Sequence, residues 1–184
     1  MSIVSSSPAG EPKAILASHI KIRSATPNDQ GWIAALQARA FGPGRFARAA
    51  FRVRERLPLD PEFCLLAEID GVPVASVSMT PISLSGINGY LLGPLATDPE
   101  YRAKGAGRAL VGEVTGRVLS SKKGGFVLLV GDEPYYAPLG YVQTQPNAII
   151  FPGPVDPRRI LVHSDNSALA HDLHGAIAAP VANQ

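Results

Sequence analysis

The feature that most constrains the fold is an uninterrupted apolar run, GFVLLVG, at residues 125–131. Short runs of aliphatic residues between glycines are typical of a strand that is buried on both faces. The stretch before this run, from Gly105 and Gly107 to about Ser121, carries apolar residues at helical spacing: Leu110, Val111, Val114 and Val118. A helix that leads into such a strand indicates an α/β domain, with helices packed against a central sheet.

The composition fits a single domain in a reducing compartment. The chain has 184 residues, of which 46% are hydrophobic and 17% are charged, and its formal net charge is +2. That charge is too small to indicate a nucleic-acid partner. Cys64 is the single cysteine, which excludes an internal disulfide. Because the sequence contains no apolar run of membrane-spanning length and no signal peptide, we expect a cytoplasmic monomer or homodimer that does not bind membranes.

Helix and turn signals divide the first half of the chain into elements. We expect a first strand at 19–23, a helix that begins at Thr26-Pro27, and a second helix over 45–56. Asp70-Gly71 is the turn signal of a hairpin that spans 62–83.

The second half continues the alternation. A strand at about 89–96 contains Gly93-Pro94, and a proline inside a strand predicts a bulge. After the apolar run we expect a short helix at 134–138, a strand from Tyr141, and an edge strand within VDPRRILVH, residues 155–163. Up to the strand from Tyr141, the element order is β-α-α-β-β-β-α-β-α-β.

Three segments follow from these patterns. Residues 1–18 lack periodicity and are predicted to be a flexible N-terminal tail. Residues 19–163 form the predicted domain, and 164–184 are predicted to be a weakly structured C-terminal extension.

Residues 98–110, DPEYRAKGAGRAL, place two glycines at the start of a predicted helix. A helix N-terminus presents free N–H groups and a partial positive charge, and glycine lets a phosphate approach the backbone closely. The P-loop pattern fails because Arg108-Ala109 follows Gly107, and the dinucleotide-binding pattern fails because Leu110 stands at its third glycine. The pattern [RQ]-x-x-G-x-[GA] is filled by Arg102, Gly105 and Gly107. The alternative is a helix start with incidental glycines.

Two further motifs flank the glycine loop. Leu95-Ala96-Thr97-Asp98-Pro99-Glu100-Tyr101 precedes it, and Tyr135-Tyr136-Ala137-Pro138-Leu139-Gly140-Tyr141 follows the apolar run. In this order they resemble the motifs of the GNAT superfamily of N-acetyltransferases: a segment like L-A-V-x-P-x-[YF], an acyl-CoA pyrophosphate loop, and a motif like F-Y-x-x-L-G-F. LLVGDEPYYAPLGY looks most like the YhbS-like branch. The resemblance covers about residues 20–150 and implies the GNAT acyl-CoA N-acyltransferase fold, a mixed central sheet with splayed parallel strands, flanked by helices.

The resemblance implies that acetyl-CoA, as a cosubstrate and without a metal, lies between the strand that ends at Thr97 and the strand that ends at Gly131. The bulge would leave backbone groups of Leu95 and Thr97 for the pantetheine, since an open strand edge needs a partner. N–H groups of Ala103 through Arg108 would hold the pyrophosphate. The residues expected to bind the cosubstrate are Leu95, Ala96, Thr97, Arg102, Ala103, Lys104, Gly105, Ala106, Gly107 and Arg108.

Tyr136 stands at the family's general-acid position, where its hydroxyl would face the sulfur of CoA. The alternative is an aromatic residue of the core or rim whose hydroxyl has a structural partner. A backbone N–H near Leu95 or Ala96 is a candidate for stabilising the oxyanion. Glu68 and Asp132 are candidate bases, although Asp132 also stands where a short helix would be capped, and the base stays unassigned.

The resemblance implies an acetyl-CoA-dependent N-acetyltransferase in which a primary amine attacks the thioester directly. The acceptor is a small-molecule or peptide amine that the fold does not identify. The alternative is a non-catalytic acyl-CoA-binding or sensing module. A stripe of arginines along the second predicted helix either attracts an anionic acceptor or is a solvated basic face. Its members are Arg45, Arg48, Arg52 and Arg56.

Overall fold

The structure is a computed structural model that describes residues 19–44, 49–121 and 123–182. The strands within these ranges are β1 (Ile20–Ser24), β2 (Leu65–Ile69), β3 (Val72–Leu84), β4 (Ile87–Thr97), β5 (Val127–Val130), β6 (Val142–Gln143), β7 (Ile149–Ile150), β8 (Ile160–His163) and β9 (Gly175–Ala176). The α-helices are α1 (Gln30–Phe41), α2 (Ala49–Arg54), α3 (Ala106–Ser120), α4 (Glu133–Tyr136) and α5 (Ser167–Asp172).

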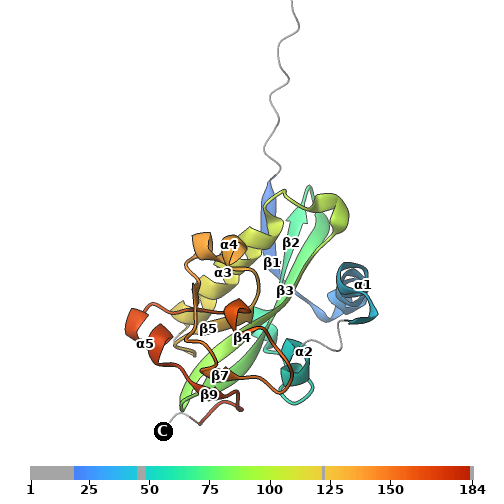
Figure 1. The fold of residues 1–184 in the computed structure, drawn as a ribbon. Coiled ribbons are helices and arrows are strands. Elements are labelled where there is room, and N and C mark those ends of the chain that lie inside the picture. The colour runs from blue at the N-terminus through green and yellow to red at the C-terminus, as the bar shows by residue number, and fades with distance from the viewer. Residues whose placement is uncertain (1–18, 45–48, 122, 183–184) are drawn as a thin grey trace, which may run out of the picture.

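A mixed sheet forms the centre of the described part of the chain, in the strand order β1-β2-β3-β4-β5-β8-β6 (Figure 1). Its neighbouring strands are antiparallel except for β4 and β5, which are parallel. β7 and β9 form a separate parallel pair. The predicted α/β class with a mixed sheet is therefore confirmed.

The hairpin of β2 and β3 forms where the sequence predicts it. Asp70 and Gly71 connect the strands with φ angles of 52° and 78°. Positive φ at both central residues is the requirement of a type I′ turn, whose twist matches that of the strands it joins. Ile69 accordingly pairs with Val72 directly beside the turn.

β4 carries the predicted bulge, and the bulge opens the sheet. Met79 of β3 pairs with Leu92, but Val77 pairs with Leu95, so Gly93-Pro94 of β4 oppose a single residue of β3. On its other side, β4 pairs with β5 only at Tyr90–Val127 and Leu91–Leu128. The two parallel strands diverge beyond these pairs, which confirms the predicted splay.

Both faces of the sheet are covered. Figure 1 shows α3 and α4 on one side of the sheet and α1 and α2 on the other. Val127 and Leu129 of β5 face the core that α3 covers, whereas Leu128 faces the core that contains Val53 of α2. Alternation between two buried faces explains why the sequence of β5 is apolar without interruption.

One sheet position differs from the sequence-based expectation. The strand predicted within residues 155–163 was expected at an edge, but β8 lies between β5 and β6. The physical reason is that Ile160, Leu161 and Val162 are all at most 1% exposed, and a strand that is apolar on both faces belongs inside a sheet. The short β6 forms the edge in its place, with both of its residues exposed.

The structure describes much of the predicted C-terminal extension but none of the predicted N-terminal tail. Residues 1–18 lie outside the described residues, so their predicted mobility stays a prediction. Within 164–182, α5 and β9 are ordered elements, and Ala170 and Leu173 are buried in the core beneath α2. Of the second predicted helix, 45–56, the structure describes 49–56, in which α2 ends at Arg54; Arg45 and Arg48 lie outside the described residues.

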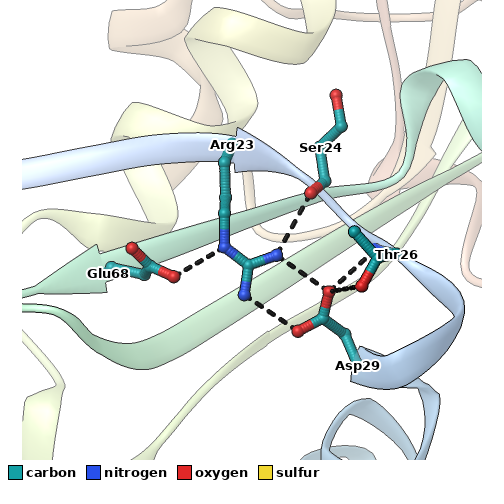
Figure 2. Close-up of polar contacts among 5 residues, drawn as sticks. All are labelled: Arg23, Ser24, Thr26, Asp29 and Glu68. Carbon is teal, nitrogen blue, oxygen red and sulfur yellow. Dashed lines mark hydrogen bonds and ion pairs between the residues drawn. The ribbon is translucent and has the colours of Figure 1, made fainter.

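An ion-pair network connects the start of α1 to the sheet (Figure 2). The guanidinium of Arg23 donates to both carboxylate oxygens of Asp29, at 2.8 Å each, and to Glu68 on β2 at 2.6 Å. Asp29 also accepts from the backbone N–H and the hydroxyl of Thr26, both at 2.7 Å, as the predicted helix start requires. These hydrogen bonds, led by that from Arg23, hold the pKa of Asp29 well below its usual range. The network therefore joins β1, β2 and Asp29, the N-cap of α1.

Candidate active site

The glycine loop lines the larger of two adjoining cavities, which we call the loop lobe. Its volume is about 690 Å³. Its described lining residues are Ala40, Phe41, Leu95, Ala96, Thr97, Tyr101, Arg102, Ala103, Gly105, Ala106, Gly107, Arg108 and Tyr135. The structure thus brings together the predicted cosubstrate-binding residues with one exception. Lys104 is not among the lining residues, and its ammonium lies 4.5 Å from the ring of Tyr101.

The backbone of this loop is shaped to receive an anion. Gly105 has φ of 87°, and the first hydrogen bond of α3 runs from Ala109 N to Gly105 O at 3.0 Å. The N–H groups of Ala106, Gly107 and Arg108 therefore precede the helical pattern and point from the helix N-terminus. A Cβ atom at Gly107 would lie 2.8 Å from the hydroxyl of Tyr135, so a side chain there would fill the loop lobe.

The end of β4 presents an open edge to the lobe. Asp98 N donates to Val74 O of β3 at 2.8 Å, and backbone groups alternate in direction along a strand. Ala96 therefore faces β3 as Asp98 does, while Leu95 and Thr97 face the opening toward β5. The carboxylate of Asp98 holds this end in place, since it binds Arg39 of α1 at 2.8 Å.

The second cavity, the helix lobe, has a volume of about 270 Å³ and lies beside α1 and α2. Its described lining residues are Gln37, Phe41, Ala50, Phe51, Arg54, Leu92, Gly93, Pro94, Leu95, Leu129, Val130, Gly131, Asp132, Tyr135, Tyr136 and Arg159. Phe41, Leu95 and Tyr135 line both lobes, so the two cavities form one cleft at the splay of β4 and β5.

Tyr136 lies in the helix lobe, with its ring packed on Gly131. A Cβ at Gly131 would be 2.2 Å from Cε2 of Tyr136, so only glycine admits the ring at this position. Burial raises the pKa of Tyr136 to about 12, and the hydroxyl is protonated at neutral pH. No group in the described ranges forms a hydrogen bond with this hydroxyl, which leaves its proton available to a ligand.

The neighbouring tyrosines have different environments. The hydroxyl of Tyr141 is buried and lies 2.6 Å from Thr115 Oγ1, so Tyr141 is a residue of the core. Tyr135 lines both lobes, and the guanidinium of Arg108 lies 5.3 Å from its ring. The sequence held one signal that Tyr135 lines the cleft: it is a tyrosine at a motif position where the family pattern has phenylalanine.

The two candidate bases are placed differently. Glu68 is bound by Arg23 and is not among the residues that line either lobe. Asp132 lines the helix lobe, where its Oδ1 lies 3.2 Å from Arg159 Nε. Arg159 is brought there by the pairing of β5 with β8, since its carbonyl accepts from Gly131 N at 2.9 Å.

Sequence reasoning missed Arg54. Its guanidinium carbon lies 5.4 Å from the ring centroid of Phe51, and both side chains line the helix lobe. Of the predicted arginine stripe, Arg52 pairs with Glu55 at 3.3 Å, and both Arg52 and Arg56 line a surface hollow outside the cleft. Helical spacing places Ala50 and Arg54 on one face of α2. Which face of α2 borders the cleft becomes known only from how the helix packs on the sheet.

Other site types find little support in the described ranges. They contain no group of three or more His, Cys, Asp or Glu side chains that could hold a metal ion. A search of the same ranges for a helix long and apolar enough to span a bilayer found none.

Comparison with known proteins places the cleft in context. Residues 33–141 match the acetyltransferase (GNAT) family. YhbS of Escherichia coli, solved in complex with CoA, superposes with a TM-score of 0.67 at 24% identity and covers 92% of each chain. A GNAT family acetyltransferase of Brucella melitensis, in complex with acetyl-CoA, has a TM-score of 0.61 at 22% identity, covering 88% of this chain and 96% of its own.

A more distant structure has a ligand that spans two substrates. Naa50 of Arabidopsis thaliana, in complex with the bisubstrate analogue CoA-Ac-MVNAL, has a TM-score of 0.54 at 17% identity and covers 79% of this chain and 98% of its own. No curated protein sequence matches this chain. At these identities the structural likeness is one of fold.

Proposed function

This chain belongs to the acetyltransferase (GNAT) family, and we propose that it transfers an acetyl group from acetyl-CoA to a primary amine. The observation that carries the proposal is the cleft itself. A loop with free N–H groups opens into a second lobe whose wall holds the protonated, ligand-accessible hydroxyl of Tyr136. That arrangement suits a ligand with an anionic group at one end and a reacting group at the other.

The loop lobe fits the cosubstrate in two respects. The N–H groups at the start of α3 and the charges of Arg102 and Arg108 suit the pyrophosphate. The outward backbone groups of Leu95 and Thr97 suit the amides of pantetheine, as a neighbouring strand would. The CoA complex of YhbS and the acetyl-CoA complex of the Brucella protein support the same assignment.

Acetyl-CoA supplies the acetyl group as a thioester. The amine nitrogen forms a bond to the carbonyl carbon, the carbon–sulfur bond breaks, and the sulfur leaves as a thiolate while the amine nitrogen loses a proton. The N–H of Leu95, on the open side of β4, is our candidate donor to the carbonyl oxygen as its negative charge grows.

Tyr136 stabilises the departing thiolate in this proposal. Its pKa of about 12 lies above that of a thiol, roughly 8.5, so full proton transfer from the tyrosine to the sulfur is unfavourable. The hydroxyl therefore acts mainly by donating a hydrogen bond to the sulfur, and the proton that the amine loses balances the charge. A cytoplasmic location and a monomeric or homodimeric state stay predictions from the sequence.

The test is release of the CoA thiol from acetyl-CoA, measured across a panel of amines, with the acetylated product identified by mass. We expect release that depends on the presence of an amine. Binding of CoA without any amine-dependent release would contradict catalysis and favour the acyl-CoA-sensing module instead.

A further inference from the structure

We propose that Tyr135 is a further cosubstrate-binding residue, whose hydroxyl donates a hydrogen bond to the phosphate of CoA that lies nearest the pantetheine. The inference rests on the proposed function in one respect, since it takes CoA as the ligand of the loop lobe. It deepens that function by adding a neutral side-chain donor from α4 to the backbone donors of α3. The family motif has phenylalanine at this position, and a phenylalanine ring has no such donor.

The position of the hydroxyl is the first observation. A Cβ atom at Gly107 would lie 2.8 Å from the hydroxyl of Tyr135 and 3.1 Å from Oγ1 of Thr97. The two hydroxyls, one from α4 and one from the end of β4, therefore flank one point beside the first turn of α3. Figure 1 shows α3 and α4 on the same side of the sheet, which lets a side chain of α4 reach that turn. An anion that binds at this turn therefore lies within reach of the Tyr135 hydroxyl.

The state of the hydroxyl is the second observation. No group in the described part of the chain forms a hydrogen bond with it, and Tyr135 is 36% exposed. Burial of the rest of the side chain raises the pKa of Tyr135, against the opposing charge of Arg108, so the hydroxyl keeps its proton at neutral pH. A phosphate oxygen is an anionic acceptor, and a hydroxyl that has a proton and no partner is a suitable donor to it.

The ring of Tyr135 is held from two sides, which is the third observation. The ring of Tyr136 packs against it edge to face, with centroids 4.8 Å apart and planes at 74°. The guanidinium carbon of Arg108 lies 5.3 Å from its centroid on another side. A ring held in this way loses little side-chain freedom when its hydroxyl binds a ligand. Because Arg108 is in the first turn of α3, a cation and a neutral donor lie close together at the anion site.

The choice of phosphate follows from the place of Tyr135 in the cleft. Tyr135 lines both lobes, as Phe41 and Leu95 do, and so lies where the lobes join. In the proposed function the pyrophosphate lies at the loop and the thioester lies in the helix lobe, with the pantetheine between them. The phosphate closest to the junction is therefore the one that is bonded to the pantetheine. The other phosphate leads to the adenosine and lies farther from the helix lobe.

The experiment shortens the cosubstrate step by step. The ligands are CoA, then 4′-phosphopantetheine, which keeps only the phosphate nearest the pantetheine, and then pantetheine, which has no phosphate. The quantity measured is the Kd of Tyr135→Phe divided by the Kd of the wild type, by calorimetry, with displacement of CoA for the weaker ligands. We expect a ratio of about three to ten for CoA and for 4′-phosphopantetheine, as one hydrogen bond to an anion provides. The ratio for pantetheine should be close to one.

Two further variants locate the cause of the loss. Tyr136→Phe removes the neighbouring hydroxyl, which lies in the helix lobe, and its ratio should be close to one for all three ligands. Arg108→Gln removes a charge, so its ratio for CoA should fall as the salt concentration rises. The ratio for Tyr135→Phe should not change with salt, because a neutral hydroxyl has no charge to screen. Thermal unfolding without ligand verifies that each variant is folded.

The outcomes separate this inference from the proposed function. Equal affinity for CoA in Tyr135→Phe and the wild type, or a loss that persists with pantetheine, would overturn the binding role of Tyr135 and leave the acetyltransferase intact. A loss with CoA but none with 4′-phosphopantetheine would overturn the choice of phosphate. Binding of CoA with no transfer to any amine would contradict the proposed catalysis and leave the ratios for Tyr135→Phe as a separate result.

Discussion

The two lobes of the cleft are built in different ways. Most of the loop lobe comes from one continuous stretch, residues 95–108, and its shape is a matter of backbone: the open edge of β4, the glycines and the start of α3. The helix lobe draws on α1, α2, the bulge, the end of β5, α4 and Arg159, and its shape is a matter of how side chains pack. The loop lobe is thus suited to a constant ligand, and the helix lobe can change its ligand through a few surface substitutions on α1 and α2.

The largest expected effect comes from blocking the backbone-built lobe. Gly107→Glu places a side chain where the nearest atoms are the Tyr135 hydroxyl and Thr97 Oγ1, at 2.8 and 3.1 Å, and adds a negative charge at the anion site. We expect the affinity for CoA, measured by calorimetry, to fall by about a hundredfold or more, since charge repulsion and lost N–H contacts add together.

Gly116→Glu is the control for that variant, since Gly116 is exposed on the same helix and a Cβ there meets nothing within 4 Å. Its CoA affinity should match that of the wild type. Equal affinity for CoA in the Gly107 variant would remove the loop from the binding site.

The next largest effect separates turnover in the helix lobe from CoA binding in the loop lobe. Tyr136→Phe removes one hydroxyl from the helix lobe, and we expect kcat to fall by about a hundredfold while the Kd for CoA changes little. Tyr135→Phe is the paired variant, because its hydroxyl lies beside Gly107 in the loop lobe. It should weaken CoA binding by a few-fold and leave kcat near the wild-type value. An unchanged kcat in Tyr136→Phe would make Tyr136 a packing residue.

A smaller effect tests whether packing alone places the tyrosine. Gly131→Ala puts a methyl group 2.2 Å from the present position of Tyr136 Cε2, so the ring has to move. We expect kcat to fall by roughly tenfold with CoA affinity retained, because a misplaced group loses its hydrogen-bond geometry.

Gly31→Ala, at an exposed position of α1 with nothing within 4 Å of a new Cβ, provides the control and should leave kcat as it is. Loss of CoA binding together with kcat in Gly131→Ala would mean that the two lobes respond as one unit.

The smallest expected effect concerns stability and the network outside the cleft that Figure 2 shows. Arg23→Gln should lower the free energy of unfolding by about 1–2 kcal/mol at pH 7, since two partly buried carboxylates lose their charged partner. The pKa of Asp29 is lowered in the folded state, so its contribution is present above the ordinary carboxyl pKa and is lost as the pH falls toward the folded value.

Denaturant titrations of wild type and Arg23→Gln check the sign of this contribution. The stability difference should be constant between about pH 5 and pH 8 and should shrink below about pH 4, where unfolded carboxyl groups become protonated. A difference that grows on acidification would contradict the role of Asp29.

The contrast between the lobes also explains which parts of the molecule the sequence could predict. The hairpin at Asp70-Gly71, the bulge at Gly93-Pro94 and the glycine loop each depend on the backbone preferences of adjacent residues. Their positions are therefore readable from short stretches. The family motifs also singled out Tyr136 from a short stretch, since the ring of Tyr136 packs on Gly131, five residues earlier in the chain.

The remaining features depend on contacts between distant residues. Arg54 and Arg159 meet the same lobe from α2 and from the start of β8, and no spacing in the chain relates them. β8 lies between β5 and β6, and the pattern of a single strand does not reveal which strands flank it. Such features emerge only when the elements are packed together.

The side chains of Phe41, Leu95 and Tyr135 line both cavities, so the two lobes share a wall. A ligand that shifts one of these walls changes the affinity of the neighbouring cavity, and linkage requires the change to be equal in both directions. In the proposed reaction, this coupling would make the apparent affinity for the amine depend on the concentration of acetyl-CoA, and the affinity for acetyl-CoA depend equally on the amine.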